Sequence, residues 1–301
     1  MLHLSHSAGT FMCRMAARNG ETLLPLHHNC NMPGDTCFNE FKPISCIERF
    51  NLMAQADSTF VAVERGLYEF EMCSDSFDYA TLVRNPLSRM DSLASKYSSY
   101  LPIDELMKAL ANQTMSVSPY SLFLQPPLNN DTAYNSLGPD DMLRPRRLDG
   151  LGMLWFDNAL VRFLSANSTL PWTAALGRIG AAAYDAAKLT LSRFKFVMTA
   201  ETLSKDQATA RRAFGSSVLN WTAMEFSPIN DHGPHHMTQR QKKFFRERNR
   251  WDICLYKHVR RSWDLRWMRP GPAQGAAPAP AASWGGGGEE EAFEDVACPE
   301  D

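Results

Sequence analysis

The chain has 301 residues and a mass of 33.9 kDa, enough for one large domain or two small ones. Apolar residues make up 44% and charged residues 21%, which excludes a wholly disordered chain and a fibrous fold. The formal net charge of -2 argues against a dedicated nucleic-acid-binding protein, but the charge is unevenly spread. Residues 270–301 hold seven acidic residues and no Lys or Arg, so residues 1–269 carry 31 basic and 26 acidic residues, a net charge of +5.

Short apolar runs alternate with amphipathic stretches along the chain, a pattern typical of α/β proteins. The predicted strands cover residues 2–4, 59–63, 79–83 and 194–198, and the predicted helices cover residues 10–18, 87–97, 203–214 and 240–267. The last helix is long and basic, with an apolar side that includes Phe245, Leu255 and Val259. Its charge suits an anionic glycan or phosphate groups, although a solvated helix face is the commoner meaning of such a run.

The C-terminal stretch has a composition of its own. From Pro270 to Gly288, sixteen of nineteen residues are Gly, Ala or Pro, and an acidic run follows. Such a segment cannot bury enough apolar surface to offset its ordering entropy. We therefore expect a folded domain over residues 1–269 and a disordered acidic tail over residues 270–301.

Several features bear on the compartment. The chain has no run of about 18 apolar residues and no signal peptide in its first ten residues. Two of the three neighbouring cysteines Cys30, Cys37 and Cys46 are candidates for a disulfide, the alternative being three unpaired thiols. Asn-x-Ser/Thr sequons favour a secretory lumen, and they begin at Asn112, Asn130, Asn167 and Asn220.

No metal site is expected. No pair of cysteines has the CxxC spacing, and no Cys/His spacing fits zinc. The segment 231–236 holds three histidines beside an aspartate, but Gly233 and Pro234 place it in a loop, where solvated side chains are the simpler interpretation.

Three junctions between a predicted strand and the next segment carry candidate chemistry. The segment 5–10, Ser-His-Ser-Ala-Gly-Thr, has small residues that let backbone N–H groups approach an anion at a helix N-terminus. Arg84 follows the strand 79–83, Pro86 suits a first helical turn, and Ser92 lies two turns further on. Glu64 ends the strand 59–63, where open α/β sheets bind ligands.

Together these segments resemble the motifs of the Golgi carbohydrate O-sulfotransferases, which include the heparan sulfate, chondroitin and galactose sulfotransferases and their algal and protist relatives. The family pattern runs H-x-K-[TS]-[AG]-G-T, then [LV]-R-[DN]-P-x-x-R-x-x-S, then a strand with E-x-L, then N-x-x-D-x-x-L-Y. The matching segments here are residues 5–10, 82–92, 196–203 and 249–256. The resemblance covers about residues 3–92 and 190–263; the middle of the chain matches poorly.

The resemblance implies a P-loop NTPase-like three-layer α/β fold with a central parallel sheet whose first strand is clipped. It implies transfer of a sulfuryl group from 3′-phosphoadenosine 5′-phosphosulfate (PAPS) to a carbohydrate hydroxyl, in the Golgi lumen, with no metal and no nucleic-acid partner. By position, Arg84 and Ser92 would hold the 3′-phosphate, and the 5′-phosphosulfate would lie on the loop residues Ser7, Ala8, Gly9 and Thr10. Glu64 is our choice of catalytic base, with His27 and His28 as alternatives.

Two departures from the family pattern leave alternatives open. His6 stands where the family has a loop lysine, and histidine, with an ordinary pKa of about 6.5, is only partly charged at neutral pH. The departing phosphate would then be less well stabilised, so the alternative function is a non-catalytic relative that binds nucleotide or anionic glycan. The stretch that precedes the loop is short and lacks the N-terminal membrane anchor typical of the family, so we expect either a fragment of a longer protein or a chain that has lost its anchor. A P-loop kinase is disfavoured because the chain has no Gly-Lys-Ser/Thr tripeptide.

Overall fold

In a computed structural model of the chain, the described residues are 1–2, 7–24, 30–32, 44–97, 102–112, 156–165, 176–217, 219–224, 237–264, 293 and 296–299. The α-helices are α1 (Gly9–Arg18), α2 (Cys46–Gln55), α3 (Pro86–Tyr97), α4 (Ile103–Asn112), α8 (Ala159–Leu164), α9 (Ala181–Ser192), α10 (Ala200–Lys205), α11 (Gln207–Ser216), α12 (Gln239–Arg248) and α13 (Arg250–Val259). The strands are β1 (Ala80–Val83) and β2 (Phe196–Thr199), with a 3₁₀ turn η2 (Glu69–Glu71) and a π-helical turn η4 (Arg260–Asp264).

Parallel pairing places several distant chain segments side by side. β1 pairs with β2 in parallel, with Ala80 opposite Phe196. On the other side of β1, the backbone N–H of Leu2 donates to the carbonyl of Ala80 (3.0 Å). Isolated parallel bridges then join Leu2 to Val63, Leu23 to Phe60 and Asn31 to Ala62. Within the described residues, the spatial order is therefore 22–24 and 30–32, then 60–63, 1–2, β1 and β2.

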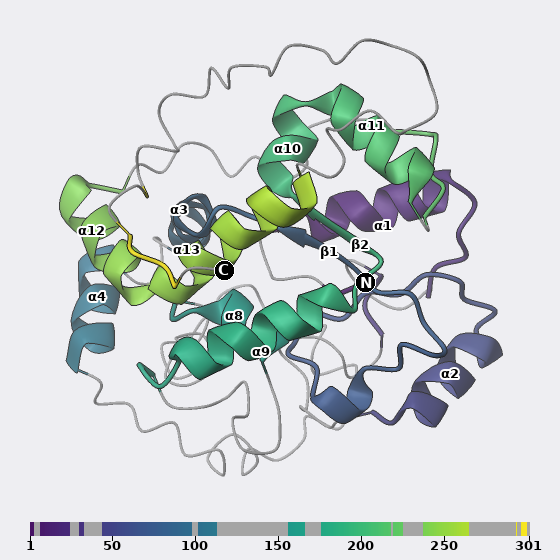
Figure 1. Cartoon of the computed structure of the whole chain (residues 1–301), viewed down its shortest axis with the longest axis horizontal. Coiled ribbons are helices and arrows are strands. Elements are labelled where there is room, and N and C mark those ends of the chain that lie inside the picture. The colour runs from purple at the N-terminus through teal and green to yellow at the C-terminus, as the bar shows by residue number, and fades with distance from the viewer. Residues whose placement is uncertain are drawn as a thin grey trace, which may run out of the picture.

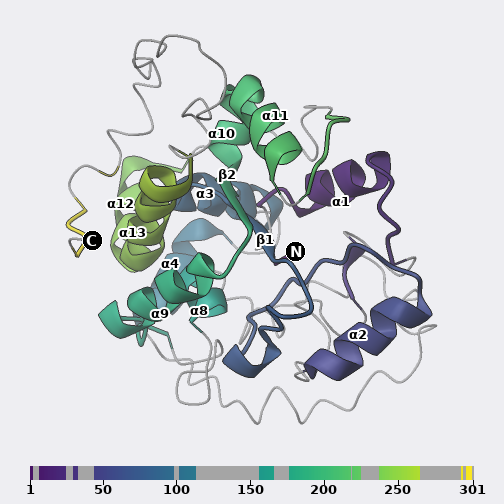
Figure 2. The same cartoon turned by 45° about the vertical axis from the view of Figure 1, so that its right-hand side comes forward.

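Apolar side chains leave these segments on two faces, as alternation along a strand requires. On one face, Leu82 and Met198 join a buried cluster with α1, α10 and α11. On the other face, Val83 and Val197 join a larger cluster with α3, α4, α8, α9, α12 and α13. Both views show α1, α10 and α11 on one side of the strands and α8 and α9 on the other (Figures 1 and 2). The strands are buried on both faces, which explains their continuous apolar sequence.

The expected strands 79–83 and 194–198 and the expected helices 10–18 and 87–97 are confirmed within two residues. Among the described residues, the stretches expected as strands over 2–4 and 59–63 form isolated bridges rather than strands, and residues 3–4 lie outside the described part of the chain. The helix expected over 203–214 divides into α10 and α11 because Asp206 caps α11 by accepting from Thr209 N–H (2.9 Å). The single helix expected over 240–267 is wrong: it breaks at Asn249, which ends α12 and precedes α13. Asn249 is fully buried, and its side-chain amide donates hydrogen bonds to the carbonyls of Phe156 (3.1 Å) and Phe245 (3.0 Å). A break of one residue leaves the apolar periodicity almost unchanged, so the pattern could not reveal it.

Part of the expected tail packs on the domain. Phe293 is buried against Tyr256 of α13, with ring centroids 6.2 Å apart. Lys257 Nζ donates to the carbonyls of Phe293 (2.6 Å) and Val296 (3.1 Å). A disulfide joins Cys298 to α13 at Cys254. Residues 293 and 296–299 therefore belong to the domain, which composition alone did not predict because the anchoring residues are few.

The disulfides also differ from the expected pairing within Cys30, Cys37 and Cys46. Cys30 pairs with Cys13 of α1, and Cys46 pairs with Cys73. Each pair joins residues adjacent in the fold but 17 and 27 positions apart in sequence. Cys37 lies outside the described residues.

Candidate functional site

The turn before α1 has the features expected of an anion-binding loop. Ala8 adopts a left-handed conformation (φ 63°), which is unfavourable for a residue other than glycine or asparagine. No side chain caps the helix, and its first turn holds no acidic residue. The hydroxyl of Ser7, which is 1% exposed, has no hydrogen-bond partner among the described residues. Backbone strain and an unsatisfied buried hydroxyl persist only where something compensates them, and an anion at this N-terminus would do so.

The second expected segment follows β1, the strand whose Ala80 accepts a hydrogen bond from Leu2 upstream of this turn. Arg84 follows β1 and is half-buried, and Ser92 lies on α3 at the edge of the buried cluster. Asn85 caps α3, since its Oδ1 accepts from the N–H groups of Leu87 (2.9 Å) and Ser88 (3.1 Å). Residues 1–2 are hydrogen-bonded neighbours of β1, which in turn pairs in parallel with β2.

Glu201 contributes to this region, and the sequence analysis gave it no role. It lies in the first turn of α10, directly after β2, and its Oε1 accepts from the N–H of Asn85 (2.9 Å). This bond ties the residue after Arg84 to the neighbouring strand's end. The signal was present in the sequence, because Glu201 follows a predicted strand within the segment that resembles E-x-L.

Glu64 directly follows the segment 60–63, and its side chain is buried (7% exposed). Its Oε2 accepts from the side-chain amide of Asn31 (3.1 Å), which holds the carboxylate from the neighbouring segment. Val63, the residue before Glu64, bridges in parallel to Leu2, which precedes the turn at Ser7 by five residues. A buried carboxylate in this position is suited to accept a proton.

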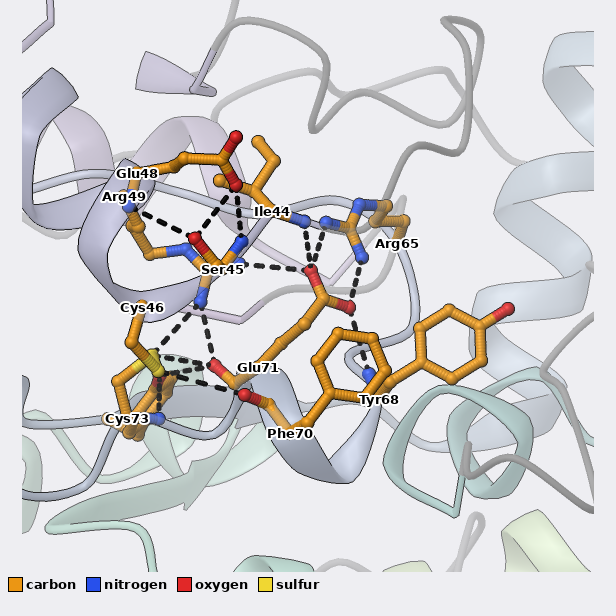
Figure 3. The surroundings of a disulfide bond; sticks show 11 residues. Ile44, Ser45, Cys46, Glu48, Arg49, Arg65, Tyr68, Phe70, Glu71 and Cys73 are labelled. Atoms are coloured by element: carbon orange, nitrogen blue, oxygen red, sulfur yellow. Dashed lines mark hydrogen bonds and ion pairs between the residues drawn. A yellow bond between two sulfur atoms is a disulfide. The ribbon is translucent and has the colours of Figure 1, made fainter.

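A buried ionic cluster fixes the chain just after Glu64 (Figure 3). Arg65 makes a bidentate pair with Glu71, with Nη2 to Oε1 at 2.6 Å and Nη1 to Oε2 at 2.9 Å. Arg49 of α2 reaches the same carboxylate (3.3 Å), and the N–H groups of Ile44 (2.9 Å) and Tyr68 (3.0 Å) also donate to it. Burial alone would raise the pKa of Glu71, but the bonds and charge of Arg65 and the two N–H groups hold that pKa below its ordinary value.

A second buried charge pair lies behind Arg84. Arg89 of α3 is 1% exposed, and this burial lowers its pKa to about 10. The carboxylate of Asp252 raises the pKa of Arg89 in opposition, whereas the positive charge of Arg84 lowers it further. Burial in turn raises the pKa of Asp252 to about 6, against the opposing effects of Arg89 and of the N–H groups of Val161 and Leu160. The pair places α13 against the helix that carries Ser92.

The segment 249–256 that resembles N-x-x-D-x-x-L-Y has a structural role here. Asn158 Oδ1 accepts from the N–H groups of Trp251 (3.0 Å) and Asp252 (3.2 Å) at the start of α13. Asp252 in return accepts from Leu160 (3.1 Å) and Val161 (2.9 Å) at the start of α8. Asn249 Oδ1 accepts from the backbone N–H of Asn158 (2.9 Å), just before α8. Each helix thus caps the other, which explains Asn249 and Asp252 without assigning them to a ligand.

Several expected residues cannot be placed. His6, His27, His28 and the segment 231–236 lie outside the described residues. Among the described residues, no group of three His, Cys, Asp or Glu side chains is arranged to hold a metal ion. Nor does the described part of the chain contain a helix long and apolar enough to cross a membrane.

A cavity of about 270 Å³ lies away from the candidate site, at the opposite edge of the parallel segments. Its lining includes Met1, Thr59, Asp78 and Tyr79, which precede or begin those segments. Neither Ser7, Glu64 nor Arg84 contributes to it. The candidate site is the region that follows residues 1–2 and β1, because the strained turn at Ala8 comes after the first and Arg84 after the second.

Comparisons with models of protein families, with curated proteins and with solved structures find no match to this chain.

Proposed function

We propose that the chain is a PAPS-dependent carbohydrate O-sulfotransferase with a P-loop-like three-layer α/β fold. The proposal depends chiefly on one observation: the backbone N–H of Leu2, five residues before the turn Ser7–Thr10, donates to the carbonyl of Ala80 in the strand that leads to the segment Arg84–Ser92. Two segments far apart in the sequence, each suited to bind an anion, therefore follow neighbouring parts of the fold.

The order of the segments supports a ligand site in this region. From residues 1–2 the chain continues through α1 to residues 22–24 and 30–32, the outermost of the described segments, and returns through α2 to residues 60–63. It then crosses to the other side of residues 1–2, to β1 and β2. Between residues 1–2 and β1 the connections therefore diverge, and open α/β sheets bind ligands in the crevice at such a point.

The residues in this region fit a donor with phosphate groups at both ends. The N-terminus of α1, free of acidic residues in its first turn, offers N–H groups and a partial positive charge to the 5′-phosphosulfate. Arg84 and Ser92 offer a guanidinium and a hydroxyl to the 3′-phosphate. When bound, PAPS supplies an electrophilic sulfuryl group for in-line attack by a sugar hydroxyl.

Glu64 is proposed to take the proton of that hydroxyl. Its side chain is oriented by Asn31, and the chain beyond it is fixed by the pair between Arg65 and Glu71. His27 and His28 remain alternatives for this role, and His6 remains the proposed partner of the sulfate. The Golgi lumen is the proposed compartment, and the disulfides Cys13–Cys30, Cys46–Cys73 and Cys254–Cys298 support an oxidising one.

The test separates donor binding from transfer. PAPS binding is measured by calorimetry, and transfer of labelled sulfate is measured on a panel of glycans. Arg84→Ala removes charge-assisted bonds worth about 1.5–3 kcal/mol and should weaken binding about 10- to 100-fold. The exposed Arg178→Ala is the matched control and should bind as wild type does. Equal PAPS affinity of wild type and Arg84→Ala would overturn the proposal.

Glu64→Gln keeps the size of the side chain and should lower the rate of transfer while PAPS affinity stays unchanged. His6→Lys restores the family's charge and should increase transfer at neutral pH. If wild type and His6→Lys both bind PAPS without transferring sulfate to any glycan, the non-catalytic binding protein is the correct function.

A further inference from the structure

The sequon Asn220-Trp-Thr222 lies in a turn at the surface, directly after α11. Asn220 is exposed and adopts a left-handed conformation (φ 47°), which asparagine tolerates better than most residues. Thr222 is also exposed. A bulky polar group on the Asn220 side chain would therefore extend into solvent without displacing the core.

The middle residue of the same sequon belongs to the core. Trp221 is 1% exposed and stacks on Phe214 of α11, with ring centroids 5.7 Å apart and planes at 6°. It also contacts Phe60, at 5.4 Å between centroids, and its indole N–H donates to Glu21 Oε1 (3.1 Å). Trp221 thereby closes the apolar cluster beneath α1 and α11.

The backbone of the three residues is fixed as well. The N–H of Asn220 donates to Ser217 O (3.1 Å), and that of Trp221 donates to Phe214 O (3.1 Å). The N–H of Thr222 donates to the side chain of Asn19 (2.9 Å). An enzyme that modifies Asn220 needs access to the tripeptide, and the burial of Trp221 together with these bonds restricts that access once the chain has folded.

We infer that Asn220 is an acceptor for an N-linked glycan and that it is modified before Trp221 packs. In this step the Asn220 amide nitrogen forms a bond to the anomeric carbon of an oligosaccharide activated as a glycosyl diphosphate. The bond between that carbon and the diphosphate oxygen breaks, the amide loses one proton, and the diphosphate leaves as an anion. The disulfides among the described residues favour passage through the oxidising lumen where this reaction occurs. The inference does not depend on the proposed sulfotransferase activity.

Packing of Trp221 competes with modification, so we expect only part of the chains to carry a glycan at Asn220. A fast-folding chain covers the sequon early, whereas a chain whose folding is delayed leaves it accessible for longer. Trp221→Ala removes the anchor from the core while keeping the sequon, and should raise the fraction modified at Asn220.

The experiment directs the full chain into the secretory pathway of cultured cells with a cleavable signal peptide. Site occupancy is read by mass spectrometry after glycosidase treatment in heavy-oxygen water, which converts a modified Asn to a labelled Asp. Wild type should show label at Asn220, and Thr222→Ala should show none. Thr222→Ala changes an exposed side chain and leaves Asn220 in place, so it should fold; the exposed Thr22→Ala is its matched control and should keep the label.

Absence of label at Asn220 in both wild type and Trp221→Ala would overturn the assignment of the site. Label at Asn220 with equal occupancy in wild type and Trp221→Ala would overturn its competition with folding. Occupancy that rises when dithiothreitol delays formation of the Cys13–Cys30 disulfide would support that competition independently, because this disulfide belongs to the same apolar cluster.

Discussion

Replacing Glu71 with glutamine should destabilise the protein strongly, because one carboxylate serves two buried guanidinium groups. Arg49, Arg65 and Glu71 are 3%, 1% and 0% exposed, so water cannot replace a lost interaction. Glutamine keeps one acceptor oxygen but turns the other into an N–H donor. That donor would face N–H groups of Arg65 and Tyr68, which now bond to Oε2.

The expected loss is about 3–5 kcal/mol of unfolding free energy, the usual cost of removing one partner from a buried ion pair. Glu105→Gln is a matched control with the same chemical change. Glu105 pairs with Lys108 on α4 at 2.6 Å, but the two side chains are 55% and 67% exposed. Solvent screens this pair, so the control should lose no more than about 0.5 kcal/mol.

Urea denaturation followed by tryptophan fluorescence measures both variants against wild type. The depressed pKa of Glu71 adds a pH signature. Because the folded state binds this proton less tightly than the unfolded state, the ionised carboxylate contributes its full stability above its ordinary pKa of 4.5. That contribution is lost as the pH falls from there through the lower folded-state pKa, so the gap between wild type and Glu71→Gln should narrow in acid. A gap below about 1 kcal/mol near neutral pH, similar to that of the control, would refute the reasoning.

Other contacts give predictions that the same denaturation assay can check. Cys298→Ser opens a 44-residue loop and should cost about 2–4 kcal/mol under oxidising conditions; an unchanged unfolding midpoint would show that the C-terminal segment adds no stability. Asn158→Gly removes the cap of α13 and should cost about 1–2 kcal/mol. Asn158→Ala should cost about 1 kcal/mol more than the glycine variant, because Asn158 has a φ of 50°; equal losses would contradict the role assigned to its backbone.

The sequence predicted those elements whose cause is local. The β-branched and apolar runs at 79–83 and 194–198 became β1 and β2, and the amphipathic stretches at 10–18 and 87–97 became α1 and α3. It also predicted that the turn at Ser7 and the segment after β1 carry the candidate chemistry, since small residues and a strand-end arginine can be recognised one residue at a time.

What could not be predicted depends on contacts between distant residues. The break at Asn249 exists because Asn158, about ninety positions earlier, donates its backbone N–H to the Asn249 side chain. The partner of Cys46 is Cys73, chosen by the way α2 packs on η2 rather than by spacing. Burial of Glu71 between Arg49 and Arg65 likewise needs α2 to lie against the end of segment 60–63, which composition and periodicity do not encode.

The position of residues 1–2 between segments 60–63 and β1 has a consequence for the order of events during synthesis. Residues 1–2 lie between these two segments and are synthesised before both, because their partners follow 60 residues or more later in the chain. β1 can pair only after β2 has been synthesised. Asn85, which follows β1, and its hydrogen-bond partner Glu201, which follows β2, are 116 residues apart in the chain. The Cys13–Cys30 and Cys46–Cys73 disulfides, by contrast, close short loops and can form early. We therefore expect a slow-folding chain of high contact order, whose emerging N-terminal half is held compact by two covalent links until the second half arrives.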